Sequence, residues 1–350
     1  MLIRGLGLIG APGFGADAWE GALRAGWRAP APTAAGRAAY LVDFDAVPDK
    51  TLLRKLRRAD KLSKMAVLAA AGALADAGLE PGAAGRVGLV LATALGPHVT
   101  TFEFLDGVLD YGDAAASPTA FSHSVHNAAA SYVASSLGLQ GPTLTVTRFS
   151  FAFQEALRLA GCWLAQGSCD HVLVGMAEQY GDVLGYLAAE KLGSAADGRI
   201  RPFACGGPGP VPGEGAVFLL LGGAAAGASG CRIDAVHIGC GAPPAGTADL
   251  LLTEADGLLP DASGYLPALN CGVPVAGYAP LAGSMLTGGA FTLAAGVLML
   301  RRQVRFAAPV PDNPHALPVV AATAPARLAT VHSLALDCGG DWAITCLRAG

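Results

Sequence analysis

Apolar runs of five to nine residues alternate along the chain with longer stretches in which apolar residues recur at helical spacing. Because strands buried on both faces are apolar throughout, these runs predict a sheet covered on both sides. The runs occupy residues 2–10, 86–93, 143–147, 171–176, 232–239, 273–278, 330–336 and 342–347. Helices are predicted at residues 17–25, 50–78, 100–109, 151–167 and 287–302, with a further small-residue stretch at 117–138. This order of elements indicates an α/β fold.

The rest of the chain is organised around residues 141–155, GPTLTVTRFSFAFQE. A Gly-Pro turn leads into a β-branched strand that reaches Ser150, and a helical pattern begins at about Phe151. A strand that turns sharply into a helix is the geometry of a nucleophile elbow. At such a bend a side chain lies over the helix N-terminus, where negative charge is stabilised. Ser150 is therefore the first candidate site residue.

Composition narrows the possible functions. The chain has 350 residues, of which 53% are hydrophobic and only 14% charged. Such a low charged fraction suggests that part of the surface is buried against another chain. The net charge of −4 argues against a nucleic-acid partner. The lack of an apolar run of about 18 residues argues against a membrane span, and the apolar N-terminus is interpreted as a first strand rather than a signal peptide.

The cysteines and histidines do not indicate a metal or another cofactor. Eight cysteines are present without a CxxC pair, and they are interpreted as small buried hydrophobes in a reducing cytoplasm. His123 and His126 are three residues apart, but no Cys or carboxylate completes a ligand set. Hydrogen-bonded structural histidines are the favoured interpretation.

A basic run opens the predicted helix at 50–78, and it has two interpretations. The first is a solvated, structural helix face. The second is a docking surface for an acidic carrier protein. The cations are Lys50, Arg54, Lys55, Arg57, Arg58, Lys61 and Lys64.

Two motifs together resemble the β-ketoacyl synthases (ketosynthases) of the thiolase superfamily. One is the elbow, where the family has GP-strand-TACSS-helix. The other is RPF followed by nine residues and GEGA, at residues 201–216. The stretch RRADKLSKMAVLAAAGALADAG, at 57–78, is also similar to the family. The resemblance covers nearly the whole chain and implies a thiolase-like, duplicated α-β-α-β-α layered fold. Its halves are expected at 1–222 and 231–350 in one compact unit, with 222–230 as a flexible connection.

The resemblance also shows which catalytic groups have changed. The family's nucleophilic cysteine matches Ser150, and its first histidine, in EAHGTGTP, matches Asp256. The lysine and second histidine of KSNIGH match Ser284 and Gly289. An ionised Asp256 would repel an enolate, and no aligned base remains to activate a serine. The phenylalanine of the family's GFGG loop matches Cys338.

The resemblance therefore implies a catalytically inactive subunit of a type II polyketide synthase. Such a subunit is called the chain-length factor or ketosynthase β subunit. The segment SVHN is similar to the corresponding segments of polyene and aryl-polyene systems. The partners of the subunit would be an active ketosynthase α subunit, which pairs with the strand at 143–147, and an acyl carrier protein. No nucleic acid, membrane, metal or cofactor is expected, and the location is expected to be cytoplasmic. The residues expected at the acyl tunnel or the interface are Phe121, Ser124, Val125, Asn127, Phe149, Phe151 and Thr145.

Alternatives remain open. Ser150 could be acylated by a serine-dependent acyltransferase or esterase built on a thiolase fold. The chain could also be a homodimeric binding protein for acyl chains. Phe121 could be a core residue rather than part of a tunnel wall.

Overall fold

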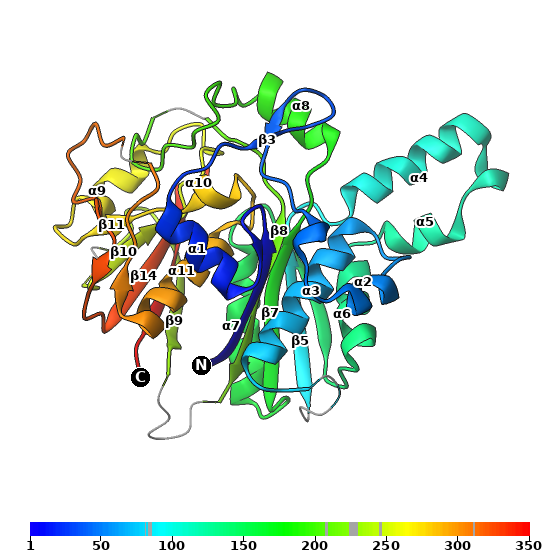
Figure 1. Cartoon of the computed structure of the whole chain (residues 1–350), viewed down its shortest axis with the longest axis horizontal. Coiled ribbons are helices and arrows are strands. Elements are labelled where there is room, and N and C mark those ends of the chain that lie inside the picture. The colour runs from blue at the N-terminus through cyan, green and yellow to red at the C-terminus, as the bar shows by residue number, and fades with distance from the viewer. Residues whose placement is uncertain (81, 83–85, 207–208, 224–229, 245–246, 311) are drawn as a thin grey trace.

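The computed structural model describes residues 1–80, 82, 86–206, 209–223, 230–244, 247–310 and 312–350. One large sheet forms the body, and layers of helices cover it (Figure 1). Its strands are β1 (Leu2–Gly10), β2 (Gly13–Phe14), β5 (Val87–Thr93), β6 (Thr143–Thr147), β7 (His171–Glu178), β8 (Gly215–Gly222), β9 (Arg232–Cys240), β10 (Leu250–Thr253), β11 (Val275–Ala276), β14 (Thr330–Leu336) and β15 (Asp341–Arg348). Two small hairpins, β3–β4 (Ala31–Pro32, Ala38–Ala39) and β12–β13 (Val304–Arg305, Ala324–Pro325), lie outside it.

The same strand pattern occurs twice in this sheet. The N-terminal half has the order β1-β8-β7-β5-β6, and the C-terminal half has the order β9-β15-β14-β10-β11. In both halves each of the first three strands pairs antiparallel with its neighbour, and the last two continue parallel to the third. The halves join edge to edge where Leu2 of β1 pairs with Arg232 of β9. The strand order thus shows the duplication that the resemblance implies.

Helices fill three layers around the two halves. The helices are α1 (Ala16–Ala25), α2 (Lys50–Lys55), α3 (Lys61–Asp76), α4 (His98–Tyr111), α5 (Pro118–His123), α6 (Ala128–Leu137), α7 (Ala152–Ala165), α8 (Asp182–Glu190), α9 (Leu266–Leu269), α10 (Ala279–Ala282) and α11 (Gly289–Arg302). One core cluster joins α7 and α11 to strands of both halves. A second packs α3 and α6 on the outer face of the N-terminal half, and a third packs α9 on the outer face of the C-terminal half. The result is an α-β-α-β-α arrangement.

Glycines in β1 allow α3 to lie directly on the sheet. A Cβ at Gly7 would lie 2.1 Å from the carbonyl oxygen of Ala69, and one at Gly5 would lie 1.9 Å from that of Ala73. The alanine-rich face of α3 meets these bare positions, so backbone approaches backbone.

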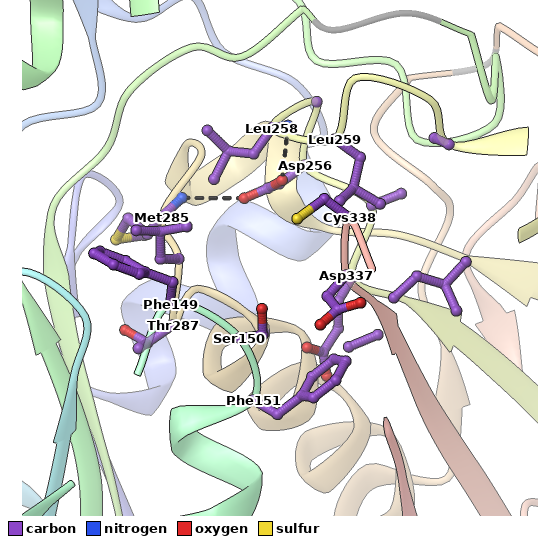
Figure 2. Close-up of a pocket in the computed structure, with 18 of the residues that line it drawn as sticks. Phe149, Ser150, Phe151, Asp256, Leu258, Leu259, Met285, Thr287, Asp337 and Cys338 are labelled. Carbon is purple, nitrogen blue, oxygen red and sulfur yellow. Dashed lines mark hydrogen bonds between the residues drawn. The ribbon is translucent and has the colours of Figure 1, made fainter. Parts of the chain in front are cut away.

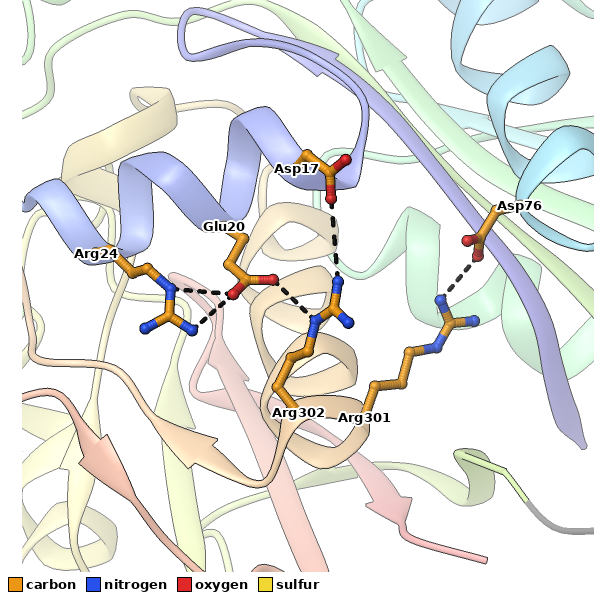
Figure 3. Close-up of polar contacts among 6 residues, drawn as sticks. All are labelled: Asp17, Glu20, Arg24, Asp76, Arg301 and Arg302. Atoms are coloured by element: carbon orange, nitrogen blue, oxygen red, sulfur yellow. Dashed lines mark hydrogen bonds and ion pairs between the residues drawn. The ribbon is translucent and has the colours of Figure 1, made fainter.

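A group of ion pairs ties α11 to the N-terminal half. Arg301 contacts Asp76 at the end of α3 (2.8 Å), and Arg302 contacts Glu20 of α1 (3.0 Å), as Figure 3 shows. Asp76 also accepts a hydrogen bond from the backbone N–H of Leu6 in β1. The two arginines lie in the last turn of α11, where cations interact favourably with the helix dipole.

Helices α4 and α5 form an arm that projects from the body (Figure 1). It exposes large apolar side chains between acidic ones such as Glu103, Asp106 and Asp110. Leu109 is 82% exposed and Phe121 is 58% exposed, and the ring of Phe121 lies 5.6 Å from that of Phe104. The alternative that Phe121 belongs to the core is therefore wrong for the isolated chain.

Two predicted helices are interrupted in the structure. The helix predicted at 50–78 is two helices, because the carboxylate of Asp60 accepts a hydrogen bond from the N–H of Ser63 and begins α3 as an N-cap. The stretch 117–138 likewise splits into α5 and α6. The strand predicted at 273–278 is reduced to β11, and residues 224–229 of the expected connection lie outside the described residues.

The prediction that the cysteines are buried is only partly correct. Cys169, Cys205 and Cys231 are buried, but three others are exposed, namely Cys162, Cys240 and Cys338. Cys162 lies in α7, whereas Cys240 ends β9 and Cys338 lies in the β14–β15 turn. Being apolar did not suffice to place these side chains in the core.

We predict that Gly7→Ala strongly destabilises the protein. The added methyl group would meet the backbone of α3, so a loss of about 3 kcal/mol in the free energy of unfolding is expected. Gly21→Ala in α1 is the matched control, because nothing lies within 4 Å of that position. The free energy of unfolding of the control should increase by up to about 1 kcal/mol, because alanine favours a helix more than glycine does. Urea unfolding of both variants is the measurement, and equal stabilities would show that the close approach of α3 is unimportant.

Candidate functional site

A cavity of about 320 Å³ lies where the two halves meet, at the N-terminal ends of α7 and α11 (Figure 2). The segment after β10 and the β14–β15 turn complete its wall. Its lining includes Ser150, Asp256 and Gly289, three positions that the sequence predicts as degenerate catalytic positions, together with Cys338. Segments far apart in the sequence therefore converge at one cavity.

The elbow is strained at the residue after Ser150. Phe151 has a φ of 58°, a left-handed conformation that bulky residues seldom adopt, and α7 begins at the next residue. Its ring is nearly buried against Ala335 and Ala343 of the C-terminal half, which holds the bend in place. Ser150 is left facing the cavity, and no hydrogen bond links its hydroxyl to another described group.

Glu254 is a site residue that the sequence analysis did not single out. Its carboxylate accepts hydrogen bonds from the amide of Gln154 in α7 (3.1 and 3.3 Å) and from the hydroxyl of Ser333 in β14 (2.8 Å). A Cβ at Gly289 would lie 1.8 Å from Oε2 of Glu254. The carboxyl therefore fills the space that any side chain at position 289 would need. Its place two residues before Asp256 in the matched motif is the signal that could have identified it.

Asp256 and Ser284 hold the opposite wall together. The carboxylate of Asp256 accepts hydrogen bonds from the N–H groups of Leu258 (3.1 Å) and Met285 (3.2 Å). The hydroxyl of Ser284 donates to the carbonyl oxygen of Asp256 (2.6 Å) and accepts from the N–H of Val211 (3.0 Å). The hydrogen bonds of both side chains are therefore made to backbone groups of the wall.

Three carboxyls around the cavity have raised pKa values. Burial raises the pKa of Glu254 and of Asp256 to about 7, and the proximity of Glu254 adds to the effect at Asp256. Burial also raises the pKa of Glu178 to about 7; this residue accepts a hydrogen bond from the cavity-lining Thr287. Burial therefore opposes the ionisation of Asp256 that the sequence analysis expects.

The described residues that line the cavity include no histidine, lysine or arginine. The ionisable groups among them are Glu254, Asp256, Tyr265, Asp337 and Cys338. Burial also raises the pKa of Tyr265 well above its ordinary value. The lining thus provides no imidazole that could serve as a general base or as a donor to an enolate.

The predicted tunnel and interface residues fall into two groups. Phe149 and Phe151 line the cavity beside Ser150, and Phe149 is 68% exposed. The others lie outside it: Phe121, Ser124, Val125 and Asn127 belong to α5 or the segment before α6, and Thr145 lies in the edge strand β6. Asn127 precedes α6 without a side-chain cap bond, and the buried hydroxyl of Thr145 has no partner within the described residues.

The histidine pair is divided by the end of α5. His123 ends that helix, and its Nε2 lies 2.8 Å from the hydroxyl of Tyr132, as the structural interpretation expects. The ring of His126 packs beside Gly96 instead. Among the described residues there is no cluster of His, Cys, Asp and Glu suited to a metal ion, and no helix has the length and apolar character needed to cross a bilayer.

Comparison with known proteins identifies the family. The family model described as "Beta-ketoacyl synthase, N-terminal domain" matches residues 17–226. The chain belongs to the β-ketoacyl synthase family. Nodulation protein E of Rhizobium meliloti (strain 1021) is 31% identical over 182 residues, which is 51% of this chain and 45% of that protein. "Granaticin polyketide putative beta-ketoacyl synthase 1" of Streptomyces violaceoruber is 28% identical over 193 residues, 51% of this chain and 46% of that protein. The chain spans about half the length of these curated relatives.

Solved structures confirm the thiolase-like fold over the full chain. "The ishigamide ketosynthase/chain length factor" has a TM-score of 0.81 at 20% identity and covers 100% of this chain and 98% of that one. A complex described as "type II PKS acyl-carrier protein in complex with its ketosynthase bound to the hexaketide" has a TM-score of 0.75 at 18% identity, with coverages of 100% and 99%. The structural similarity thus covers both halves of the chain, whereas the family model matches only residues 17–226.

We predict that Glu254→Gln changes how stability depends on pH. A carboxyl with a raised pKa keeps its proton in the folded state while the unfolded chain releases it. Its contribution to stability therefore falls from about pH 4.5 to about pH 7 and is constant above. As the pH rises from 5 to 8, the free energy of unfolding of the Gln variant should increase by about 1–3 kcal/mol relative to that of the wild type.

Thermal and urea unfolding across this pH range provide the measurement. Asp170→Asn is the control, because the hydrogen bond from the backbone of Arg86 lowers the pKa of Asp170. That carboxyl is ionised in both states above pH 5, so the stability difference between control and wild type should not vary. A pH-independent difference for Glu254→Gln would contradict the expected protonation.

Proposed function

We propose that this chain is a catalytically inactive ketosynthase-like subunit, a chain-length factor. It would heterodimerise with an active β-ketoacyl synthase and shape the acyl tunnel in type II polyketide biosynthesis. We further propose that it acts in the cytoplasm in a polyene or aryl-polyene system. The growing chain would be carried by an acyl carrier protein.

One observation carries this proposal: the carboxyl of Glu254 lies where a side chain at position 289 would have to be. The resemblance places a catalytic histidine there, so the loss is built into the packing and is more than a single substitution. Asp256 and Ser284, at two further catalytic positions, are both engaged in holding backbone. With Ser150 at the nucleophile position, the described cavity lining offers no thiolate at the elbow and none of the imidazole or ammonium groups that the family's chemistry uses.

The surface supports pairing with a second subunit. Strand β6 is a sheet edge with Leu144 45% exposed, and it carries no charged side chain that would discourage pairing with another strand. The apolar arm of α4 and α5 and the exposed ring of Phe149 add to this surface. Together they support an extended apolar interface, as an obligate complex requires. One similar structure is itself described as a ketosynthase/chain length factor.

The basic run supports a contact with a carrier protein. Arg54, Lys55, Arg57 and Arg58 are exposed on α2 and the turn that follows it, and none forms a salt bridge within the described residues. Lys61 differs, because it pairs with the buried Glu214. A cluster of unpaired cations on a chain of net charge −4 favours an acidic partner. A similar structure contains an acyl carrier protein bound to its ketosynthase.

A serine acyltransferase or esterase that uses Ser150 is the second candidate, favoured only by the position of Ser150 at the elbow. The hydroxyl needs a hydrogen-bonded base, and none contacts it among the described residues. A homodimeric acyl-binding protein is the third candidate. Co-purification with a neighbouring ketosynthase would distinguish that candidate from the heterodimer.

We predict that Ser150→Ala leaves product formation nearly unchanged in the complex with an active ketosynthase. The hydroxyl has no activating base, so its removal should alter the rate by less than about threefold. The assay follows polyketide product per assembled heterodimer, and mass spectrometry tests whether Ser150 becomes acylated by acyl-carrier substrates. A loss of about a hundredfold, or an acylated Ser150, would favour the serine enzyme.

We predict that the segment at residues 121–125 sets product length. Phe121→Ala should lengthen products, because each CH₂ buried in an enlarged tunnel gains about 0.8 kcal/mol. Ser124→Phe and Val125→Phe should shorten them. Since Phe121 is exposed in this chain, its truncation should not cost the stability of a core residue. Product profiles per assembled heterodimer are the measurement, and unchanged lengths in all three variants would remove this segment from the tunnel wall.

A further inference from the structure

The arm formed by α4 and α5 has little packing surface of its own (Figure 1). Neither helix contains a buried residue, although α4 runs for 14 residues. The two helices are held together by the rings of Phe104 and Phe121 and by the hydroxyl of Thr101, which donates to the carbonyl oxygen of Ser124 (3.1 Å). A helix of this length is marginal in water and depends on packing against an apolar surface. Within the described residues the arm lacks such a surface.

Two stripes of exposed side chains run side by side along α4. The apolar stripe consists of Phe102, Leu105 and Leu109, which are 44%, 46% and 82% exposed. The acidic stripe consists of the exposed residues Glu103, Asp106 and Asp110. In both stripes the spacing of three and four residues places the side chains on one face of the helix. One residue corresponds to about 100° of rotation, so the acidic stripe adjoins the apolar one.

The acidic stripe has no counter-ion among the described residues. None of its three carboxylates takes part in a salt bridge there. A partner that covers the apolar stripe also brings its rim against these carboxylates and removes water from them. Because carboxylates that lose water without gaining a cation are costly, the rim of a matching partner has to carry lysine or arginine. A second copy placed arm to arm would instead oppose like charges.

We infer that α4 selects the partner subunit by charge: its apolar stripe lies in a groove of the active ketosynthase, and its acidic stripe requires lysine or arginine along the rim of that groove. The inference rests on the proposed function and adds how this chain chooses a different subunit over a second copy of itself. Apolar contact alone does not distinguish the two partners. The acidic stripe does, because complementary charges favour one partner and like charges disfavour the other.

Binding of the full-length chain to the neighbouring ketosynthase tests this inference. The two proteins are purified separately and titrated at about 50 mM and about 500 mM NaCl, which differ in how strongly they screen exposed charges. The triple variant Glu103→Gln, Asp106→Asn, Asp110→Asn removes the charges and keeps the shapes of the side chains. At low salt it should bind about tenfold more weakly than the wild type, through slower association, and it should lose most of the salt dependence.

Two further variants separate the stripe from other effects. The matched control is the triple variant Glu80→Gln, Glu190→Gln, Asp341→Asn, which removes the same number of charges from exposed positions outside the arm. It should bind as the wild type does at both salt concentrations. Leu109→Gln, in the apolar stripe, should weaken binding but leave the salt dependence unchanged, because it removes apolar contact and no charge.

The outcomes distinguish this inference from the proposed function. If the wild-type chain forms no complex with the ketosynthase, both fail. If the wild type binds and the neutralised arm binds as tightly as the control variant, the inference alone is overturned. Sedimentation of the chain without the ketosynthase examines the second copy as occupant. Stronger self-association of the neutralised arm than of the control supports the inference, whereas self-association of the wild type that weakens on neutralisation would identify a second copy as the occupant and overturn it.

Discussion

The contact between the carboxyl of Glu254 and the N-terminal ends of α7 and α11 is the interaction on which the centre of this protein depends. It joins residues 100 positions apart, Gln154 and Glu254, and it adds Ser333 from a third segment. Position 289 has to be glycine for the carboxyl to fit. Hydrogen bonds from Gln154 and Ser333 offset part of the cost of burying this carboxyl, and the cost that remains appears as its raised pKa. The interaction therefore fixes both the packing and the electrostatics of the cavity.

Much of the fold follows from the sequence, for identifiable reasons. The strands at 2–10 and 330–336 have the predicted bounds, because long apolar runs leave little ambiguity about what is buried. Helix breaks were less predictable. Asp60 acts as an N-cap only because the chain turns there, and a carboxylate inside an otherwise helical pattern does not reveal this alone. Exposed cysteines such as Cys338 were misjudged because exposure depends on turns rather than on residue type.

The candidate site was predictable as far as motifs could be matched. Ser150, Asp256 and Gly289 were named from aligned motifs, and the structure brings all three to one cavity. Motif matching did not reveal which polar contacts these residues form in the cavity. The position of Glu254 in the matched motif marks it as a candidate, but its contact with Gln154 joins two distant segments and cannot be derived from local spacing or composition. Similarly, the sequence analysis expects Asp256 to be ionised. Its raised pKa depends on how completely the fold encloses the carboxyl, and this enclosure is a tertiary property that the sequence does not reveal.

The chain holds a buried ion pair, while the positions that the resemblance assigns to catalysis hold other residues, and this contrast bears on how the proposed inactive subunit would persist. Glu214, in the GEGA motif, is fully buried, pairs with Lys61 and accepts N–H groups of Val42 and Tyr180. Removing one partner of such a network leaves an unpaired buried charge, which strongly destabilises a protein. Catalytic groups in an open cavity carry no comparable penalty, since water can solvate what is lost. Selection for stability alone would therefore preserve Glu214 and Lys61 and leave positions 150, 256 and 289 free to change.

The unpaired edge of β6 and the apolar arm are not explained in this way, because exposed apolar surface stabilises nothing in a lone chain. The partner subunit of the proposed function would account for them, because pairing along β6 would cover this surface.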